Sequence, residues 1–161
     1  MCALSPRSGG GLFGGSPSRW GAGKLQGQFT SGPCSITQMA AIEAYEGDQQ
    51  SVRMMKEAFE HRRDVVYELT NATPGFRAER PEGAFYIFPE CSAWFGKKTA
   101  EGEEIKNADD LAMYLLMEAH VASVSGVGFG APNYIRFSYA NSEENIREAF
   151  RRINAALAKL N

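Results

Sequence analysis

The chain has 161 residues, of which 43% are hydrophobic and 22% charged, the balance of one ordinary globular domain. Its 17 Lys and Arg against 19 Asp and Glu give a formal charge of -2, so no overall basic field attracts nucleic acid or an anionic membrane. No stretch approaches the roughly 18 consecutive apolar residues of a membrane-spanning helix. We therefore expect neither a nucleic-acid-binding nor a membrane-embedded protein.

Cysteines and histidines are few and scattered. Cys2, Cys34 and Cys91 lie far apart, with no CxxC spacing, which argues against both a disulfide framework and a zinc knuckle. His61 and His120 belong to no HExxH or HxxxH pattern, so a histidine-based metal site is disfavoured. Free thiols in a reducing compartment fit best, and we expect a cytoplasmic protein with no metal.

Residues 1–23 are rich in glycine, serine and proline and contain no acidic residue. This composition cannot bury enough apolar surface to fix a structure, so we predict a flexible tail. The segment carries Ser and Arg, as organellar transit peptides do, but it lacks their amphipathic repeat and also the apolar core of a secretory signal. The predicted division is a tail at 1–23 followed by a domain at 24–161.

Two helices are predicted in the first half of that domain. Residues 35–46 place apolar side chains at helical spacing, and Gly47 is a natural helix end. A longer helix is predicted over 49–71, followed by a Thr-Pro-Gly turn at 73–75. Its apolar stripe consists of Val52, Met55, Phe59, Val66 and Leu69.

Strands and helices alternate in the second half. A short run of β-favouring residues at 84–88, between a glycine and a proline, predicts a strand. Asn107 can cap a helix with Asp110 at its N3 position, and the apolar stripe of this helix ends near Ala119. Residues 121–124 then predict a second strand.

Residues 134–139 predict a third strand, because apolar and polar residues alternate there. Period two places Arg136 and Ser138 on one face. Three apolar residues share the opposite face: Ile135, Phe137 and Tyr139.

The final helix is predicted from a capping pair, Asn141 with Glu144, and from a regular apolar stripe. That stripe consists of Ile146, Phe150, Ile153, Leu157 and Leu160. The order of predicted elements is helix, long helix, strand, helix, strand, strand, helix. It indicates an α+β fold, or a small α/β layer, in which helices cover a small sheet.

Arg136 is the residue that the pattern singles out for binding. A guanidinium on a strand between two apolar residues needs either solvent or a planar anion, and a carboxylate suits its fork of donors. The simpler alternative is an edge-strand arginine paired with a surface glutamate. These considerations alone leave both interpretations open.

Other candidate residues have simpler explanations. The glycines of 126–130 lack the following helix that a phosphate cradle requires, so they predict a tight turn between two strands. His61, His120 and Cys34 have no visible catalytic partner. Three acidic pairs lie near helix starts, where they stabilise the helix dipole rather than form a catalytic dyad: Glu103-Glu104, Asp109-Asp110 and Glu143-Glu144.

Four longer runs change this balance when they are taken together: Lys24 to Ile36, Gln38 to Ala41, Arg80 to Pro89 and Phe129 to Ala140. They resemble the C-terminal part of class I pyridoxal-phosphate aminotransferases of fold type I. The bacterial-type aspartate aminotransferases are the most similar branch. The resemblance covers about 24–161, and the order and spacing of all the runs agree.

The resemblance implies a function for several residues. Arg136 corresponds to the strand arginine that grips the substrate α-carboxylate in such enzymes, and residues 83–86 to a segment that closes over the substrate, with Phe85 as a wall. Residues 28–31 resemble a stretch near the subunit interface of family dimers. The implied reaction transfers an amino group between an amino acid, aspartate or a similar one, and a 2-oxo acid through pyridoxal phosphate. A homo-oligomer is implied as well.

One departure from the family is large. The family's Ser-Lys motif, which holds the cofactor as a Schiff base and is followed by Gly-x-Arg, is expected upstream of Lys24 and is missing. Residues 16–21 occupy that place without a lysine, and Lys24 matches a non-catalytic position. We therefore predict a truncated aminotransferase with no catalytic residue and doubtful binding of pyridoxal phosphate. Alternatives are a carboxylate-binding module, a module that pairs with a complete aminotransferase subunit, or a poorly folding product.

Overall fold

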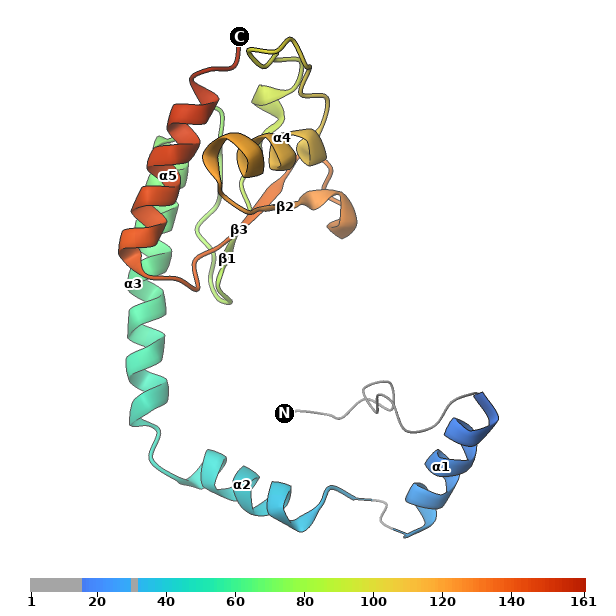
Figure 1. Ribbon diagram of the computed structural model, residues 1–161. Coiled ribbons are helices and arrows are strands. Elements are labelled where there is room, and N and C mark those ends of the chain that lie inside the picture. Colours follow the sequence, from blue (N-terminus) through green and yellow to red (C-terminus); the bar gives the residue numbers. More distant parts are fainter. Residues whose placement is uncertain (1–15, 30–31) are drawn as a thin grey trace. The chain divides into compact units, whose positions relative to one another are not determined.

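The computed structural model describes residues 16–29 and 32–161 (Figure 1). Internal contacts divide the chain after Gln49 into two units. No helix of the described part is both long enough and apolar enough to cross a membrane.

The first unit contains α1 (Ser16–Phe29) and α2 (Ser35–Glu46). Helix α2 confirms the predicted helix, and it ends where the Gly47 N–H donates to the Glu43 carbonyl. The predicted boundary after Gly23 remains a prediction. Residues 1–15 lie outside the described part, whereas the structure places 16–23 in α1, not in an irregular segment.

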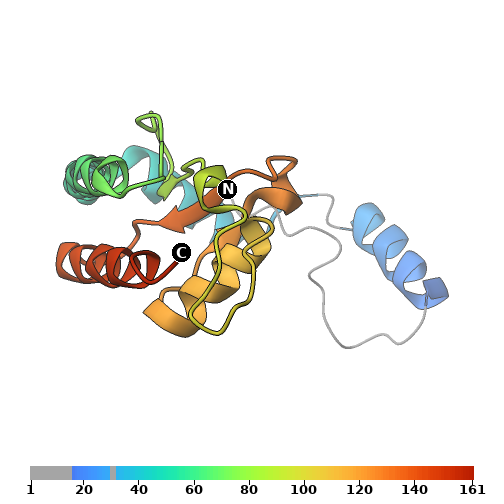
Figure 2. The same cartoon turned by 90° about the horizontal axis from the view of Figure 1, so that it is seen from above.

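The second unit packs helices against a small sheet, and its two longest helices, α3 and α5, lie side by side in both views (Figures 1 and 2). Short 3-10 turns (η1, η3) and one π-helical turn (η2) complete it. In chain order the elements are α3 (Gln50–Ala72), β1 (Tyr86–Ile87), η1 (Ser92–Trp94), α4 (Ala108–Tyr114), η2 (Leu115–Ala119), β2 (Val124–Ser125), η3 (Gly126–Phe129), β3 (Ile135–Ser138) and α5 (Glu143–Leu157).

The sheet is antiparallel, with the order β1-β3-β2, so β3 is the central strand. Tyr86 pairs with Ser138, and Val124 pairs with Arg136. One face of the sheet is buried against the core and the other carries polar and aromatic side chains, as is common in antiparallel sheets. The buried strand residues are Ile87, Ile135 and Phe137. This arrangement confirms the predicted α+β class.

Helix α5 supplies much of the core. All five residues of its predicted apolar stripe are buried, although Leu160 lies beyond the end of the helix. The predicted cap is wrong by one residue, because Ser142 accepts the Asn145 N–H whereas Asn141 accepts the Ser142 N–H. In α4 the predicted cap is confirmed, since the Asn107 side chain accepts the Asp110 N–H.

All three predicted strands are shorter in the structure, and the one predicted over 134–139 is observed as β3, Ile135–Ser138. The strand predicted over 84–88 is reduced to β1, because Ala84 adopts a left-handed conformation with φ 63° that no strand residue has. Tyr139 fixes this bend, its hydroxyl donating to the Ala84 carbonyl at 3.0 Å. The strand predicted over 121–124 begins only at Val124, since the Val121 N–H is taken by the Leu115 carbonyl of the preceding turn.

Candidate functional site

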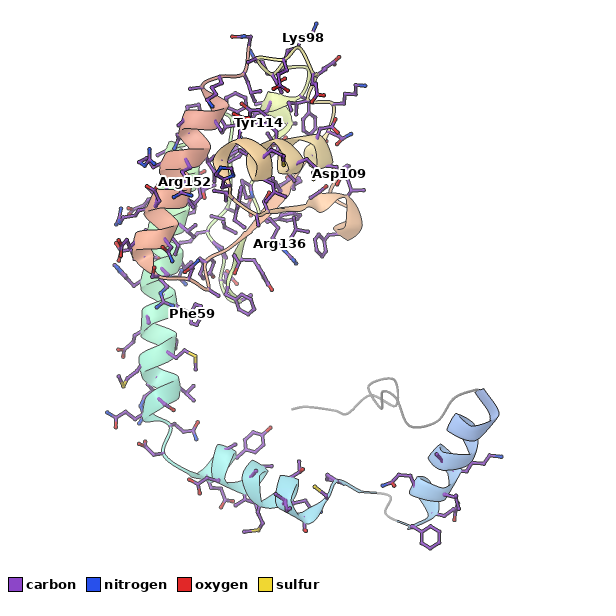
Figure 3. The ribbon with its side chains drawn as sticks, viewed as in Figure 1. Phe59, Lys98, Asp109, Tyr114, Arg136 and Arg152 are labelled. Atoms are coloured by element: carbon purple, nitrogen blue, oxygen red, sulfur yellow. The ribbon has the colours of Figure 1, made fainter. Side chains whose placement is uncertain are left out.

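Arg136 occupies the middle of the central strand, β3 (Figure 3). Its neighbours Ile135 and Phe137 point into the core, so the pleat of the strand directs the Arg136 side chain to the opposite face. The side chain is half-buried. Its predicted placement opposite the apolar face is confirmed, whereas the alternative of an arginine on an outer strand is wrong.

Two aromatic rings hold the Arg136 guanidinium. Its Cζ lies 4.3 Å from the ring centroid of Tyr86 and 4.4 Å from that of Phe129. Tyr86 reaches it from β1 as a diagonal cross-strand neighbour, because Tyr86 pairs with Ser138, two residues along β3. Phe129 reaches it from η3, which follows β2 on the other side of β3. The contacts have the geometry of cation–π interactions.

The guanidinium of Arg136 has no hydrogen bond or ion pair with any residue that the structure describes. A guanidinium carries five N–H donors in its plane. The rings contact it without accepting these donors in the plane. The arrangement can therefore bind a planar acceptor, and a carboxylate offers two oxygens at the matching spacing.

The glycine-rich loop links β2 to β3 through η3, as predicted, and it carries Phe129. The Ser125 side chain accepts the Val127 N–H, and the Gly126 N–H donates to the Tyr134 carbonyl at 2.8 Å. Gly130 ends the turn with φ 73°, a conformation that favours glycine.

Tyr86, Arg136 and Phe129 form a stack, and further aromatic residues surround it on the same side of the sheet. The Phe88 ring lies 5.3 Å from the Tyr134 ring and meets the Phe129 ring edge-on at 6.2 Å, both measured between centroids. Tyr86, Phe88 and Tyr134 also line a surface hollow of about 530 Å³. Two arginines line it as well, Arg77 and Arg80.

Arg80 is already engaged, unlike Arg136. One of its terminal nitrogens donates to Asp64 at 2.7 Å, and Arg63 donates to the same carboxylate oxygen at 2.9 Å. Hydrogen bonds from Arg80, and then from Arg63, lower the pKa of Asp64 below its usual value. This pairing ties the chain before β1 to helix α3.

Phe85 lies beside the stack, with its ring centroid 4.4 Å from that of Tyr86 and 6.3 Å from that of Phe59. It is 41% exposed, so part of its ring faces solvent. The structure thus brings Phe85 next to one of the two rings that contact Arg136. Its function as a substrate wall remains a prediction.

The other candidate residues lie elsewhere. His61 on α3 is hydrogen-bonded to Glu143 at 2.8 Å, and His120 ends η2 in a left-handed conformation. Cys34 precedes α2 in an exposed position, where a hydrogen bond with Thr37 lowers its pKa. In the described ranges no group of three His, Cys, Asp or Glu side chains could hold a metal ion.

The comparison with known families decides the affiliation. The model of the family described as "Aminotransferase class I and II" matches residues 9–153. The chain belongs to this family. It is 44% identical over 136 residues to the probable aspartate/prephenate aminotransferase of Rickettsia felis, a match that covers 84% of this chain and 33% of that protein. The aspartate aminotransferase of Rhizobium meliloti gives the same identity and coverage.

Solved structures of aminotransferases agree in fold. The aspartate aminotransferase of Rhizobium meliloti matches with a TM-score of 0.78 and 42% identity, over 89% of this chain and 36% of that one. The alanine aminotransferase of Pyrococcus furiosus matches with a TM-score of 0.70 and 27% identity, over 88% of this chain and 34% of that one. The chain therefore spans about one third of the length of its relatives and corresponds to a part of an aminotransferase.

Aminotransferases of this family depend on pyridoxal phosphate, which a lysine amine holds as a Schiff base. The groups around Arg136 do not supply such a site. The guanidinium contacts two aromatic rings, and neither this contact nor the lining of the adjacent hollow includes a lysine. The groups around Arg136 therefore fit a carboxylate and do not fit the cofactor.

Tyr86 and Phe129 are the residues that sequence reasoning missed at this site. Both stand in the runs that resemble the family, and period two along 84–88 places Tyr86 opposite Ile87, away from the core. The glycine loop was expected as a turn, without a role for the phenylalanine that it carries. Only the pairing of β1 and β2 with β3 brings both rings to Arg136.

Proposed function

We propose that this chain supplies the substrate-carboxylate clamp of an aspartate-type aminotransferase. The observation that carries the proposal is the Arg136 guanidinium, which two rings hold while its in-plane donors have no partner among the described residues. A bidentate pair with a carboxylate would satisfy two of these donors and fix the orientation of the ligand. Amino acids and 2-oxo acids both carry this group, and the relative from Rhizobium meliloti is an aspartate aminotransferase.

The chain alone is proposed to be inactive in transamination. The support is the missing Ser-Lys motif and the absence of a lysine around Arg136 in the second unit. The purified chain with added pyridoxal phosphate and borohydride is expected to show no single-lysine adduct in its intact mass. A stoichiometric adduct together with transamination would overturn this part of the proposal and leave the clamp standing.

The clamp is tested by titrating the 15N-labelled chain with maleate, a dicarboxylate, and following its amide and arginine Nε–Hε resonances. We expect a saturable shift centred on β3. Arg136→Gln should weaken binding by about tenfold or more, because a charge-assisted bidentate contact is lost. Arg152→Gln is the matched control, since Arg152 lies on α5 and is paired with Glu148. Equal binding by wild type and Arg136→Gln would overturn the proposal.

A second candidate function is pairing with a complete aminotransferase subunit. The observation that favours it is the apolar surface of helix α2. No residue of this helix is buried, and its apolar side chains Ile36 and Tyr45 are 81% and 76% exposed. Such apolar surface is typical of an interaction site. Light scattering after size exclusion, with and without the Rhizobium meliloti aspartate aminotransferase, tests it. Ile36→Lys should abolish a mixed complex, whereas Glu46→Gln, an equal change of charge on α2, should not.

We also propose the cytoplasm as the location of the chain. Cys34 and Cys91 are both free thiols, as expected in a reducing compartment.

A further inference from the structure

We propose that Tyr86 and Phe129 are positioning residues, which hold the Arg136 guanidinium between two rings so that only its in-plane donors are offered to a carboxylate. This inference rests on the proposed clamp. It assigns a purpose to the glycine-rich loop, which carries Phe129 and which the clamp itself leaves unexplained.

The two rings reach Arg136 from opposite sides. In the sheet order β1-β3-β2, Tyr86 stands on one neighbour of the central strand, and Phe129 follows the other neighbour. Both ring centroids lie closer to Cζ than the about 6 Å limit of a cation–π contact. The guanidinium is therefore in contact with two rings that come from elements far apart in sequence.

Arg80 shows how an acidic side chain, the alternative to aromatic rings, would use up the donors of a guanidinium. Its guanidinium is fixed by Asp64, which consumes N–H donors on both Nε and a terminal nitrogen. An acid beside Arg136 would fix that side chain equally well, but it would compete with any carboxylate ligand. Rings immobilise a guanidinium and leave its in-plane donors open. The same molecule thus fixes one arginine for structure and another for binding.

The glycine loop explains how Phe129 is kept in place. A Cβ atom on Gly126 would meet the Ala131 carbonyl oxygen and would lie 2.7 Å from the Tyr134 carbonyl oxygen. Only glycine therefore allows the backbone to turn back on itself this closely. Phe129 is 53% exposed, and the Phe88 ring meets it edge-on. A phenylalanine half in water gains little from burial at that site. Its contact with Arg136 supplies the reason for its position.

Preorganisation predicts a measurable effect on binding. An arginine that must be immobilised when the ligand arrives loses affinity by about twofold to tenfold. Tyr86→Leu and Phe129→Leu should each weaken maleate binding by that factor, whereas Tyr86→Phe and Phe129→Tyr, which keep the ring, should retain wild-type affinity. Val127→Ala is the matched control, because Val127 lies exposed in the same η3 turn.

A second readout separates positioning from folding. Ring currents should move the Arg136 Nε–Hε resonance away from those of the exposed arginines in the ligand-free full-length chain. Either leucine variant should move the Arg136 Nε–Hε resonance back toward those of the exposed arginines, whereas Tyr86→Phe should not. In all these variants the amide spectrum of the remaining sheet should be preserved.

The outcomes distinguish the two proposals. If Arg136→Gln abolishes binding while both leucine variants bind like wild type with an unmoved Hε resonance, the positioning function is refuted and the clamp survives. If Arg136→Gln binds maleate normally, the clamp itself is refuted. A leucine variant whose loss is not rescued by the ring-keeping substitution would also refute positioning, since the ring would not be the cause.

Discussion

Helices α2 and α5 have similar lengths and both carry apolar residues at helical spacing, yet they differ completely in burial. Helix α5 buries Ile146, Phe150 and Ile153 together with two residues near its end, whereas α2 buries none. The second unit supplies its own partners for α5, namely α3, η2 and, through the contact of Phe137 with Phe150, the central strand β3. Apolar periodicity therefore predicts that a helix forms, but the rest of the fold decides whether its apolar face is covered.

The largest expected difference is between two isoleucines. Ile153→Ala in α5 should lower the free energy of unfolding by about 2 to 5 kcal/mol, because it leaves a cavity at a side chain with 0% exposure. Ile36→Ala in α2 should change it by less than about 0.5 kcal/mol, since Ile36 is exposed. Urea denaturation followed by circular dichroism measures both. Similar losses in the two variants would show that α2 is packed in the same cooperative unit.

A pair of glycines gives the next largest contrast. Gly126→Ala should destabilise the second unit by about 1 to 3 kcal/mol, because its Cβ would press against backbone carbonyls that cannot yield easily. Gly27→Ala in α1 meets nothing within 4 Å and should raise helix content without lowering the urea midpoint. A Cβ atom on Gly128, in the same loop as Gly126, would likewise meet nothing within 4 Å. A Gly126→Ala variant as stable as wild type would contradict the close backbone approach at this turn.

The smallest expected effect is a pH dependence on the outer face of α5. Hydrogen bonds from Arg151, and then from Arg152, lower the pKa of Glu148 to about 2. A depressed carboxyl pKa contributes stability above its ordinary value, here 4.5, and this contribution is lost as the pH falls toward 2. Glu148→Gln should therefore flatten the fall of the melting temperature over that range. The double variant Arg151→Gln/Arg152→Gln should flatten the fall of the melting temperature as well. An unchanged fall in both Glu148→Gln and the double variant would exclude Glu148 as the source of this pH dependence.

The sequence predicted those elements whose pattern is repeated over several turns or a full strand. Helix α5 follows its stripe because each apolar residue faces the same core, and β3 follows its period-two alternation. Helix α3 forms where it is predicted, but the stripe is wrong in its first half, because Val52 and Met55 are exposed. The strand ends were not predictable from such patterns. The left-handed Ala84 depends on a hydrogen bond from Tyr139, 55 residues away, and no local preference announces it. The cap at Ser142 stands beside another good cap, Asn141, so composition could not choose between them.

The candidate site divides in the same way. Arg136 could be selected from the sequence, because a charged residue between two apolar strand positions must face away from the core. The rings of Tyr86 and Phe129 depend on strand order and register, which are long-range properties. A turn rich in glycine showed where the chain reverses, but only the pairing of its flanking strands shows what its one aromatic residue reaches.

The three-stranded sheet has a consequence for aggregation. Its outer strands, β1 and β2, are two residues long, while the longer β3 is paired on both sides. Long, regular outer strands act as templates for cross-β growth, and short ones end this templating after a single pair of residues. The sheet of the second unit therefore offers an incoming strand little backbone to extend, which makes this part of the chain a poor seed for fibrils.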